Sequence, residues 1–362
     1  MAFLLHRDDR RGSGSKLPRG ISLRRGTADD ETGAFDVMRR TMNSEMSWAN
    51  HSSMRHHLRA SLNCSFWVAE DSPRFGSPRV VGYARSIVRE RVWSLTEFFV
   101  LPSQHRQGVG GSLLANCMQD GDAAGADTRI VLASHHPDAD SLYIRRSGCL
   151  PLLPMMLLAG SANSLRAPDA SRGSISDNLL TGLYDDRFIP GMATLTVTHG
   201  SDVVAEPITA RGSQLDEINA LDRDIVGYAR PAEHLHWIAE MGGDHGAARA
   251  FRSRRGDRQI IGYSYVGAHC SGPTLAVDPE DLPRFFYHVG CAASALYRPG
   301  GDIGLSFMHP ADQYCAVAGI NKVMLRWLLA SGWQIVFQYL FMCTRPIGKF
   351  DRYIGHNPLY VL

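Results

Sequence analysis

The chain has 362 residues, 44% of them hydrophobic and 20% charged, with a formal net charge of +2. This composition is ordinary for a globular protein, the length suits two domains that each bury a core, and the small charge does not indicate nucleic-acid binding. The N-terminal apolar run is too short for a signal peptide and no later run is long enough to span a bilayer, so we expect a cytoplasmic protein with no membrane partner.

The cysteines indicate neither a disulfide framework nor a metal site. They are odd in number and scattered, without a Cys-x-x-Cys pair or the histidine spacing of a zinc site: Cys64, Cys117, Cys149, Cys270, Cys291, Cys315 and Cys343. We expect buried free thiols in a reducing compartment and no bound metal.

The predicted elements begin after a polar leader. Residues 1–20 lack an apolar period and predict a flexible segment, whereas Ile21–Arg25 alternates like a strand and Thr27–Asp30 offers N-cap residues for a helix to about Thr41. Three β-rich segments separated by turn residues follow, at 66–70, 79–86 and 93–101. Together they predict an antiparallel meander.

The segment from Glu97 to Leu114 is typical of a strand, a turn and a helix, with glycines at 108, 110 and 111. Glycine tolerates positive φ and lets backbone N–H groups converge on one anion, and a helix that begins near Gly111 adds its positive dipole end. No lysine precedes Ser112, as a nucleoside-triphosphate loop requires, and the third glycine of a dinucleotide fingerprint would fall at Leu113. The alternatives are a phosphate cradle of another kind and a plain glycine-rich turn.

Two motifs in this region resemble the GNAT acyltransferase superfamily. His105–Gly110 is similar to the signature Gln/Arg-x-x-Gly-x-Gly/Ala, with histidine at its first position, and Ala139–Cys149 resembles the helix motif that begins Ala-x-x-Leu-Tyr. A helix at about 111–120, a strand at 128–134, the helix that contains Tyr143 and a closing strand at 152–158 complete the unit near Gly160. The resemblance implies an α/β (α+β) fold, a mixed, mostly antiparallel twisted sheet flanked by helices.

The resemblance also implies acetyl-CoA as co-substrate and a set of residues that hold it. The expected contacts come from the strand end, the glycine loop and the loop before the Tyr143 helix: Phe99, Val100, Leu101, His105, Arg106, Gln107, Gly108, Val109, Gly110, Gly111, Ser112 and His136. Tyr143 stands where family members carry the general acid, and a phenol is protonated at neutral pH. Glu97 is the candidate general base.

For several of these residues, the alternative to a functional role is a purely structural one. By strand alternation Glu97 shares a face with Leu95 and Phe99, so it either points into a cleft or is an ion-paired strand carboxylate. Tyr143 is either an acid or a packing tyrosine. His135 and His136 either contact the coenzyme or cap the helix ahead of Pro137.

The second half echoes the first. After a linker at 161–190, anchored by Leu179, Leu180, Leu183 and Tyr184, Ile260–Ser264 matches Val80–Ala84 in a similar place, which indicates a tandem duplication with domains at 21–160 and 191–362. Thr274–Pro283 runs on without a glycine turn and brings Glu280 and Asp281 to the position of the cradle. These carboxylates would repel a pyrophosphate, so we expect the divergent second domain to be catalytically silent.

The resemblance to the GNAT superfamily implies an N-acetyltransferase, and its two-domain members imply a small-molecule primary amine as the acceptor. We expect direct attack in a ternary complex, because no cysteine lies beside a histidine in a way that suggests a covalent acyl-enzyme. One alternative is a non-catalytic acyl-CoA-binding or sensing module. Another is a protein-interaction or homodimer surface built from apolar segments such as 285–287 and 327–329.

Overall fold

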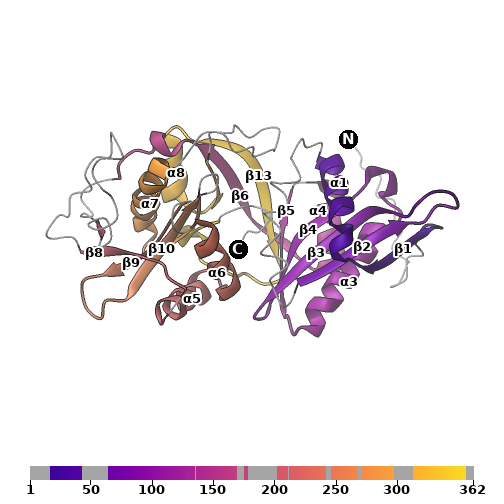
Figure 1. Ribbon diagram of the computed structural model, residues 1–362, viewed down its shortest axis with the longest axis horizontal. Coiled ribbons are helices and arrows are strands. Elements are labelled where there is room, and N and C mark those ends of the chain that lie inside the picture. The colour runs from indigo at the N-terminus through magenta and orange to yellow at the C-terminus, as the bar shows by residue number, and fades with distance from the viewer. Residues whose placement is uncertain are drawn as a thin grey trace, which may run out of the picture.

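Two lobes share one fourteen-stranded sheet in the computed structural model (Figure 1). The structure describes residues 17–42, 64–134, 136–168, 175–177, 202–210, 212–241, 246–267, 271–296 and 313–355. The strand order is β1-β2-β3-β4-β5-β13-β6-β12-β14-β11-β10-β9-β8-β7.

The first lobe follows the predicted order of elements. It contains β1 (Ile21–Arg25), η1 (Ala28–Asp30), α1 (Glu31–Met42), β2 (Cys64–Asp71), β3 (Arg79–Arg89), β4 (Val92–Val100), η2 (Pro102–Gln104), α3 (Val109–Ala123), β5 (Thr128–Ala133), α4 (Pro137–Ser147) and β6 (Leu150–Gly160). Strands β2 to β4 form the predicted antiparallel meander, β1 pairs antiparallel with β2, and β5 joins β4 in parallel.

The second lobe repeats this order. After η3 (Ala162–Ser164) and β7 (Ile175–Asp177) come β8 (Val203–Pro207), α5 (Gln214–Ile225), α6 (Pro231–Met241), β9 (Gly246–Ser253), β10 (Ile260–Gly267), β11 (Ser271–Ala276), η6 (Pro279–Asp281), α7 (Leu282–Leu296), β12 (Gln313–Ala318), α8 (Lys322–Ala330), β13 (Gln334–Cys343), η7 (Phe350–Arg352) and β14 (Tyr353–Gly355). The predicted linker anchor, residues 179–184, lies outside the described residues, as do residues 1–16 of the leader.

The sequence echo corresponds to equivalent places in the two lobes. Gly82 on β3 and Gly262 on β10 both lie where a helix presses on the sheet. A Cβ at Gly82 would meet Phe99 O at 3.2 Å and Leu113 of α3 at 3.3 Å, and one at Gly262 would meet Leu275 O at 2.4 Å and Phe285 of α7 at 2.5 Å. Glycine permits the same close approach of strand and helix in each lobe.

Each lobe completes the sheet of the other. Strand β13 of the second lobe lies between β5 and β6, with Leu340 opposite Ala133, and β6 of the first lobe lies between β13 and β12, with Leu158 opposite Cys315. In Figure 1 these two long strands run side by side through the middle of the molecule. The sheet of residues 21–160 therefore includes a strand from residues 334–343.

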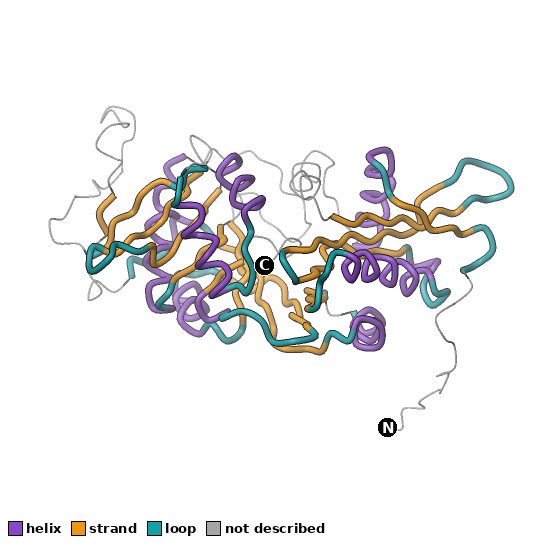
Figure 2. The backbone as a smooth tube through the Cα atoms, turned by 90° about the horizontal axis from the view of Figure 1, so that it is seen from below, coloured by secondary structure: helices purple, strands orange, loops and turns teal. Residues whose placement is uncertain are grey.

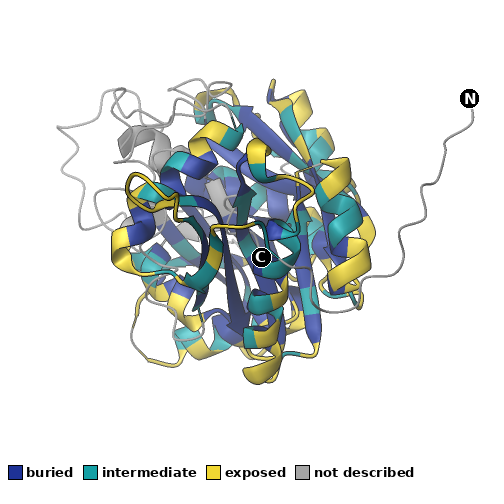
Figure 3. Ribbon diagram, turned by 90° about the vertical axis from the view of Figure 1, so that its right-hand side faces the viewer, coloured by how far each residue is buried: buried dark blue, intermediate teal, exposed yellow. Residues whose placement is uncertain are grey.

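Helices cover both faces of this sheet, as Figures 2 and 3 show, and the strands between them are mostly buried. In the first lobe Arg85 of β3 reaches Glu31 of α1, whereas Gly82 faces α3, so α1 and α3 lie on opposite faces. In the second lobe Tyr265 meets α6 while Gly262 faces α7.

The apolar segments singled out in the second half are largely core. Phe285, Phe286 and Leu328 have no exposed surface and pack in one cluster with Trp333, while Leu329 is 46% exposed. Among the described residues, no helix is long and apolar enough to cross a membrane.

Candidate functional site

The glycine loop after β4 has the backbone conformation of an anion nest. Arg106 has φ +59° and Gly108, the residue before α3, has φ +86°, so left-handed residues alternate along the loop. Such alternation turns successive N–H groups toward one point. The side chain of Gln107 closes the loop by donating to Ser103 O at 2.7 Å.

Helix α3 begins directly behind the nest. The amide of Ser112 donates to Gly108 O at 3.0 Å, which leaves the preceding amides of Val109, Gly110 and Gly111 at the open helix end. No acidic side chain lies in the first turn of this helix. The nest and the helix end together form a cradle, residues 106–111, that suits a phosphate group.

The two strands beside the cradle separate toward it. Strands β4 and β5 pair from Val92–Thr128 to Leu95–Val131, but β4 continues to Val100 and β5 to Ala133. We call this unpaired stretch, residues 96–100 and 132–133, the splay. In the described part of the chain no other strand lies between β4 and β5.

The splay exposes backbone groups of β4 that are not used by β3. Leu101 donates its N–H to Val81 O at 2.9 Å, so alternation turns the N–H and C=O of Val100 and Phe98 the other way, toward β5. Of the three predicted strand contacts, Val100 thus faces the splay, while Leu101 and Phe99 turn their backbone groups to β3. Phe98 was missed by the sequence analysis, although counting back by two from Val100 would have found it.

His105 differs from the signature and has a defined role in the loop. Its Nε2 lies 2.8 Å from Val100 O, one of the groups that face the splay. The His105 ring meets the ring of His136 edge to face, with 6.2 Å between centroids. His136 occupies the N-cap position of α4, but its side chain makes no capping hydrogen bond. His135 lies outside the described residues.

Tyr143 lies on α4 beside the splay. Its ring packs against that of Phe98, with 5.9 Å between centroids, and the residue is 6% exposed. Burial raises the pKa of the Tyr143 phenol well above its usual value. The hydroxyl therefore keeps its proton at neutral pH.

Glu97 is buried on the opposite face of β4. Its Oε2 lies 3.1 Å from Nε of Arg85, which also pairs with Glu31 of α1 at 2.7 Å. The expected common face of Leu95, Glu97 and Phe99 is wrong in part, because a bulge shifts the register: Arg85 is opposite Glu97 but Ser86 is opposite Leu95. The extra residue, Thr96, turns Leu95 to the α3 face.

The structure thus brings Tyr143 and the cradle to one end of β4 and places Glu97 on the other face. Arg106 is exposed and pairs with Asp138 at 3.2 Å. Trp93 of β4 is fully buried and donates to Cys117 O of α3 at 3.0 Å. No group of three metal-ligating side chains occurs in the residues that the structure describes.

Comparison with known proteins identifies this lobe. Residues 35–148 match the model of the acetyltransferase (GNAT) family. This part of the chain belongs to the GNAT family. The matched range contains β4, the cradle, the splay and Tyr143. No curated protein matches the sequence significantly.

Solved structures show that the likeness extends over both lobes. A proposed acetyltransferase from Pyrococcus horikoshii is 14% identical, with 95% of this chain and 97% of that chain covered and a TM-score of 0.61. A tandem GNAT protein from the clavulanic acid biosynthesis pathway is 15% identical, with 90% and 99% covered and a TM-score of 0.52. A GCN5-related N-acetyltransferase from Sphaerobacter thermophilus is 12% identical, with 93% and 100% covered and a TM-score of 0.53. The whole chain therefore has the tandem GNAT fold, with a divergent second domain.

Proposed function

We propose that this protein is an acetyl-CoA-dependent N-acetyltransferase that acts on a small-molecule primary amine. The observation that carries the proposal is the alignment of the cradle with the splay. An anion site at one end of β4 leads directly into a gap lined by backbone groups of β4 that β3 does not use. A long ligand with a diphosphate at one end and amides along its arm suits both parts.

The chain offers a complementary group for each part of the coenzyme. The amides of residues 107–111 would hold the diphosphate, with Arg106 adding a charge-assisted contact. The backbone of Phe98 and Val100 would pair with the amides of the pantetheine arm, as a neighbouring strand does. Acetyl-CoA would supply the acetyl group as a thioester.

The two proposed catalytic side chains flank the splay from opposite faces of the sheet. Glu97 would accept a proton from the acceptor amine, directly or through water, as the new C–N bond forms. Tyr143 would donate its proton to the thiolate that leaves when the C–S bond breaks. A direct transfer of this kind needs both substrates bound at once, so we expect a ternary complex.

The choice of a small molecule rests on analogy with the structural neighbours. One neighbour that covers nearly the whole chain is the tandem GNAT protein from clavulanic acid biosynthesis. That pathway makes a small molecule, and a metabolite amine is accordingly the acceptor class that we propose.

Titration calorimetry with acetyl-CoA tests the cradle. Gly108→Glu places a carboxylate in the nest and should abolish binding. Gly125→Glu is the matched control, because Gly125 lies beyond the opposite end of α3, also has positive φ (+82°), and a Cβ added there would have no atom within 4 Å. Loss of binding in both variants, or in neither, would argue against the cradle.

The second candidate is a coenzyme-binding module without catalysis. It is favoured by one observation, the ion pair of Glu97 with Arg85, which engages the proposed base. A screen of small amines separates the candidates. Acetyl transfer to any of them supports the enzyme, whereas tight coenzyme binding without transfer to any supports the module.

A further inference from the structure

The second domain has a strand in the place where the first domain has its splay. Short strand β14 lies between β11 and β12, the counterparts of β4 and β5. It pairs Ile354 with Thr274 and Tyr353 with Leu275 on one side, and Ile354 with Val317 and Gly355 with Ala316 on the other. The two strands that would splay are thereby bridged.

The pairing registers establish this correspondence residue by residue. Strand β3 aligns Gly82 with Val100 and Ala84 with Phe98, and β10 aligns Gly262 with Ala276 and Ser264 with Thr274. Thr274 thus corresponds to Phe98, whose backbone faces the first splay. Strand β14 pairs with the residues that, in the first domain, are left for the coenzyme arm.

The loop that would receive the diphosphate is shortened in the second domain. In the first domain four residues, 105–108, separate η2 from α3 and include both left-handed positions of the nest. In the second domain η6 ends at Asp281 and α7 begins at Leu282. The side chain of Asp278 accepts from the amide of Glu280 at 3.0 Å, so a carboxylate of the chain itself takes an amide at this turn.

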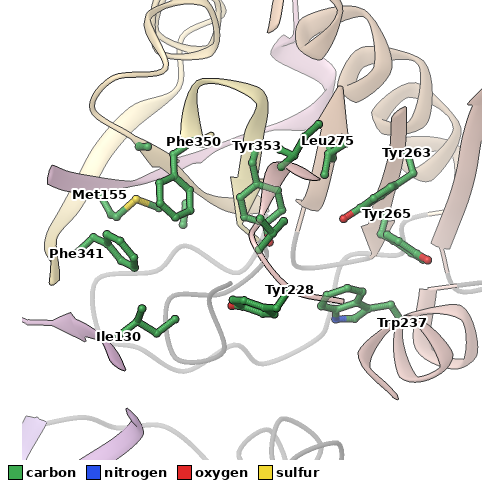
Figure 4. Close-up of a cluster of buried hydrophobic side chains, with 14 of the residues drawn as sticks. Ile130, Met155, Tyr228, Trp237, Tyr263, Tyr265, Leu275, Phe341, Phe350 and Tyr353 are labelled. Carbon is green, nitrogen blue, oxygen red and sulfur yellow. The ribbon is translucent and has the colours of Figure 1, made fainter. Parts of the chain in front are cut away.

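A buried polar network holds β14 in place. The hydroxyl of Tyr353 accepts from Nη1 of Arg230 at 2.7 Å, and Arg230 pairs with Asp222 at 2.8 Å. Asp222 also accepts from the hydroxyl of Tyr263 and lies 2.9 Å from Nε2 of His234. Figure 4 shows Tyr353 beside Leu275, with Tyr263 on the neighbouring strand. Arg230 and Asp222 are at most 1% exposed, so their charges depend on these contacts.

We propose that β14 is a built-in occupant of the second domain's coenzyme slot. A peptide strand presents amides along an extended backbone, as the pantetheine arm does, and so satisfies the same edges of β11 and β12. The second domain therefore binds its own chain instead of acetyl-CoA. The protein takes up one coenzyme per chain, at the first domain.

Hydrogen exchange of the ligand-free protein tests the occupant independently of any coenzyme. The amides around Thr274–Ala276 and Ala316–Val317 should be protected before a ligand is added, whereas those of Phe98 and Val100 should exchange faster. Ile354→Pro removes an N–H of β14 and should speed exchange in β11 and β12. Rapid exchange in the wild-type β11 and β12 amides would overturn the proposal, whether or not acetyl-CoA binds.

If Ile354→Pro does not fold, Tyr353→Phe is the milder variant. It removes only the hydroxyl that Arg230 contacts and should speed exchange of the same amides. Tyr228→Phe is the matched control, because the Tyr228 hydroxyl is buried and has no hydrogen-bond partner among the residues that the structure describes. Equal exchange in the two variants would show that the network does not hold β14.

Calorimetry gives the second readout. Acetyl-CoA should bind at one equivalent per chain, its addition should leave exchange in β11 and β12 unchanged, and Gly108→Glu should remove all binding. Two equivalents, or one equivalent that survives in Gly108→Glu, would overturn the proposal. If the wild-type protein binds no acetyl-CoA, the proposed function fails, while the exchange data still decide whether β14 fills the slot.

Discussion

Tyr143 is the residue to which we assign proton donation to the leaving thiolate. Its phenol is buried beside Phe98, and burial raises its pKa. Tyr143→Phe keeps the ring and removes the proton, so kcat should fall by about 10²-fold while the dissociation constant of acetyl-CoA stays unchanged. Steady-state kinetics and calorimetry measure the two quantities.

Tyr228→Phe is the control for this substitution, since it removes a buried hydroxyl between α5 and α6 of the second lobe. An unchanged kcat in Tyr143→Phe would reduce Tyr143 to a packing residue.

The two equivalent glycines give a graded test of close packing. In Gly262→Ala the new Cβ would lie 2.4 Å from Leu275 O, and in Gly82→Ala it would lie 3.2 Å from Phe99 O. Overpacking of this kind costs about 1–3 kcal/mol of unfolding free energy, and Gly262→Ala should cost the more. Urea unfolding measures both.

Gly111→Ala serves as the contrast in these unfolding experiments. Its Cβ would meet no neighbouring atom closer than 3.9 Å, and alanine is favoured over glycine in a helix by about 1 kcal/mol. If Gly262→Ala is as stable as Gly111→Ala, the strand and helix do not approach as closely as described.

Asp222 should make the second domain sensitive to acid. Burial alone would raise the pKa of its carboxyl, but Arg230 and His234 outweigh burial and hold the pKa below the usual range. A depressed pKa contributes stability above the unfolded value, near 3.8, and this contribution is lost as pH falls toward the folded pKa. Unfolding of wild type and Asp222→Asn at pH 7 and pH 3 should therefore show a difference that shrinks in acid. A difference that grows in acid would contradict this.

At the scale of elements, the sequence predicts local structure well where one pattern dominates. Alternation located β1, β-rich composition between turn residues located β2 to β4, and the glycines at 108, 110 and 111 located the turn into α3. The bulge at Thr96 could not be predicted, because one extra residue leaves the alternation readable on both sides of it. That single residue sends Leu95 and Glu97 to opposite faces.

The exchanged strands and β14 lay beyond sequence reasoning for a different reason. Residues 152–158 read as a closing strand and do form part of β6, but hydrophobic pattern does not say which strand lies next to it. Strand β14 has three residues and no period to detect. In the proposed site, glycine spacing located the cradle. The backbone direction of Val100, from which that of Phe98 follows by alternation, came only from the hydrogen bond of Leu101 to Val81 O.

Packing between helices and strands also protects two cysteine thiols from alkylation. Burial raises the pKa of Cys117 to about 12 and that of Cys149 to about 11. Thiolate is the reactive form, so iodoacetamide at pH 8 should label both thiols only after unfolding. Mass spectrometry of native and denatured samples measures this. Rapid labelling of Cys117 in the native protein would show that the space between β2, β3 and α3 opens.

At the scale of the whole molecule, the two halves depend on each other through the middle of the sheet. Removing residues 334–343 would expose the edge of β5 and one edge of β6 together. A truncated chain that ends near residue 168 should therefore aggregate or associate with itself, which gel filtration would detect. A stable monomer of that length would mean that β13 is dispensable to the first domain.

Because β6 and β13 cross the boundary in both directions, the peptide link between the halves adds little to what holds them together. The two halves are in effect two subunits that happen to be covalently linked. A cut in the connecting segment should therefore leave them associated. A protease site introduced between residues 178 and 201 provides the cut. The two fragments should co-migrate under native conditions, keep whatever coenzyme affinity the uncut protein has, and separate only in denaturant.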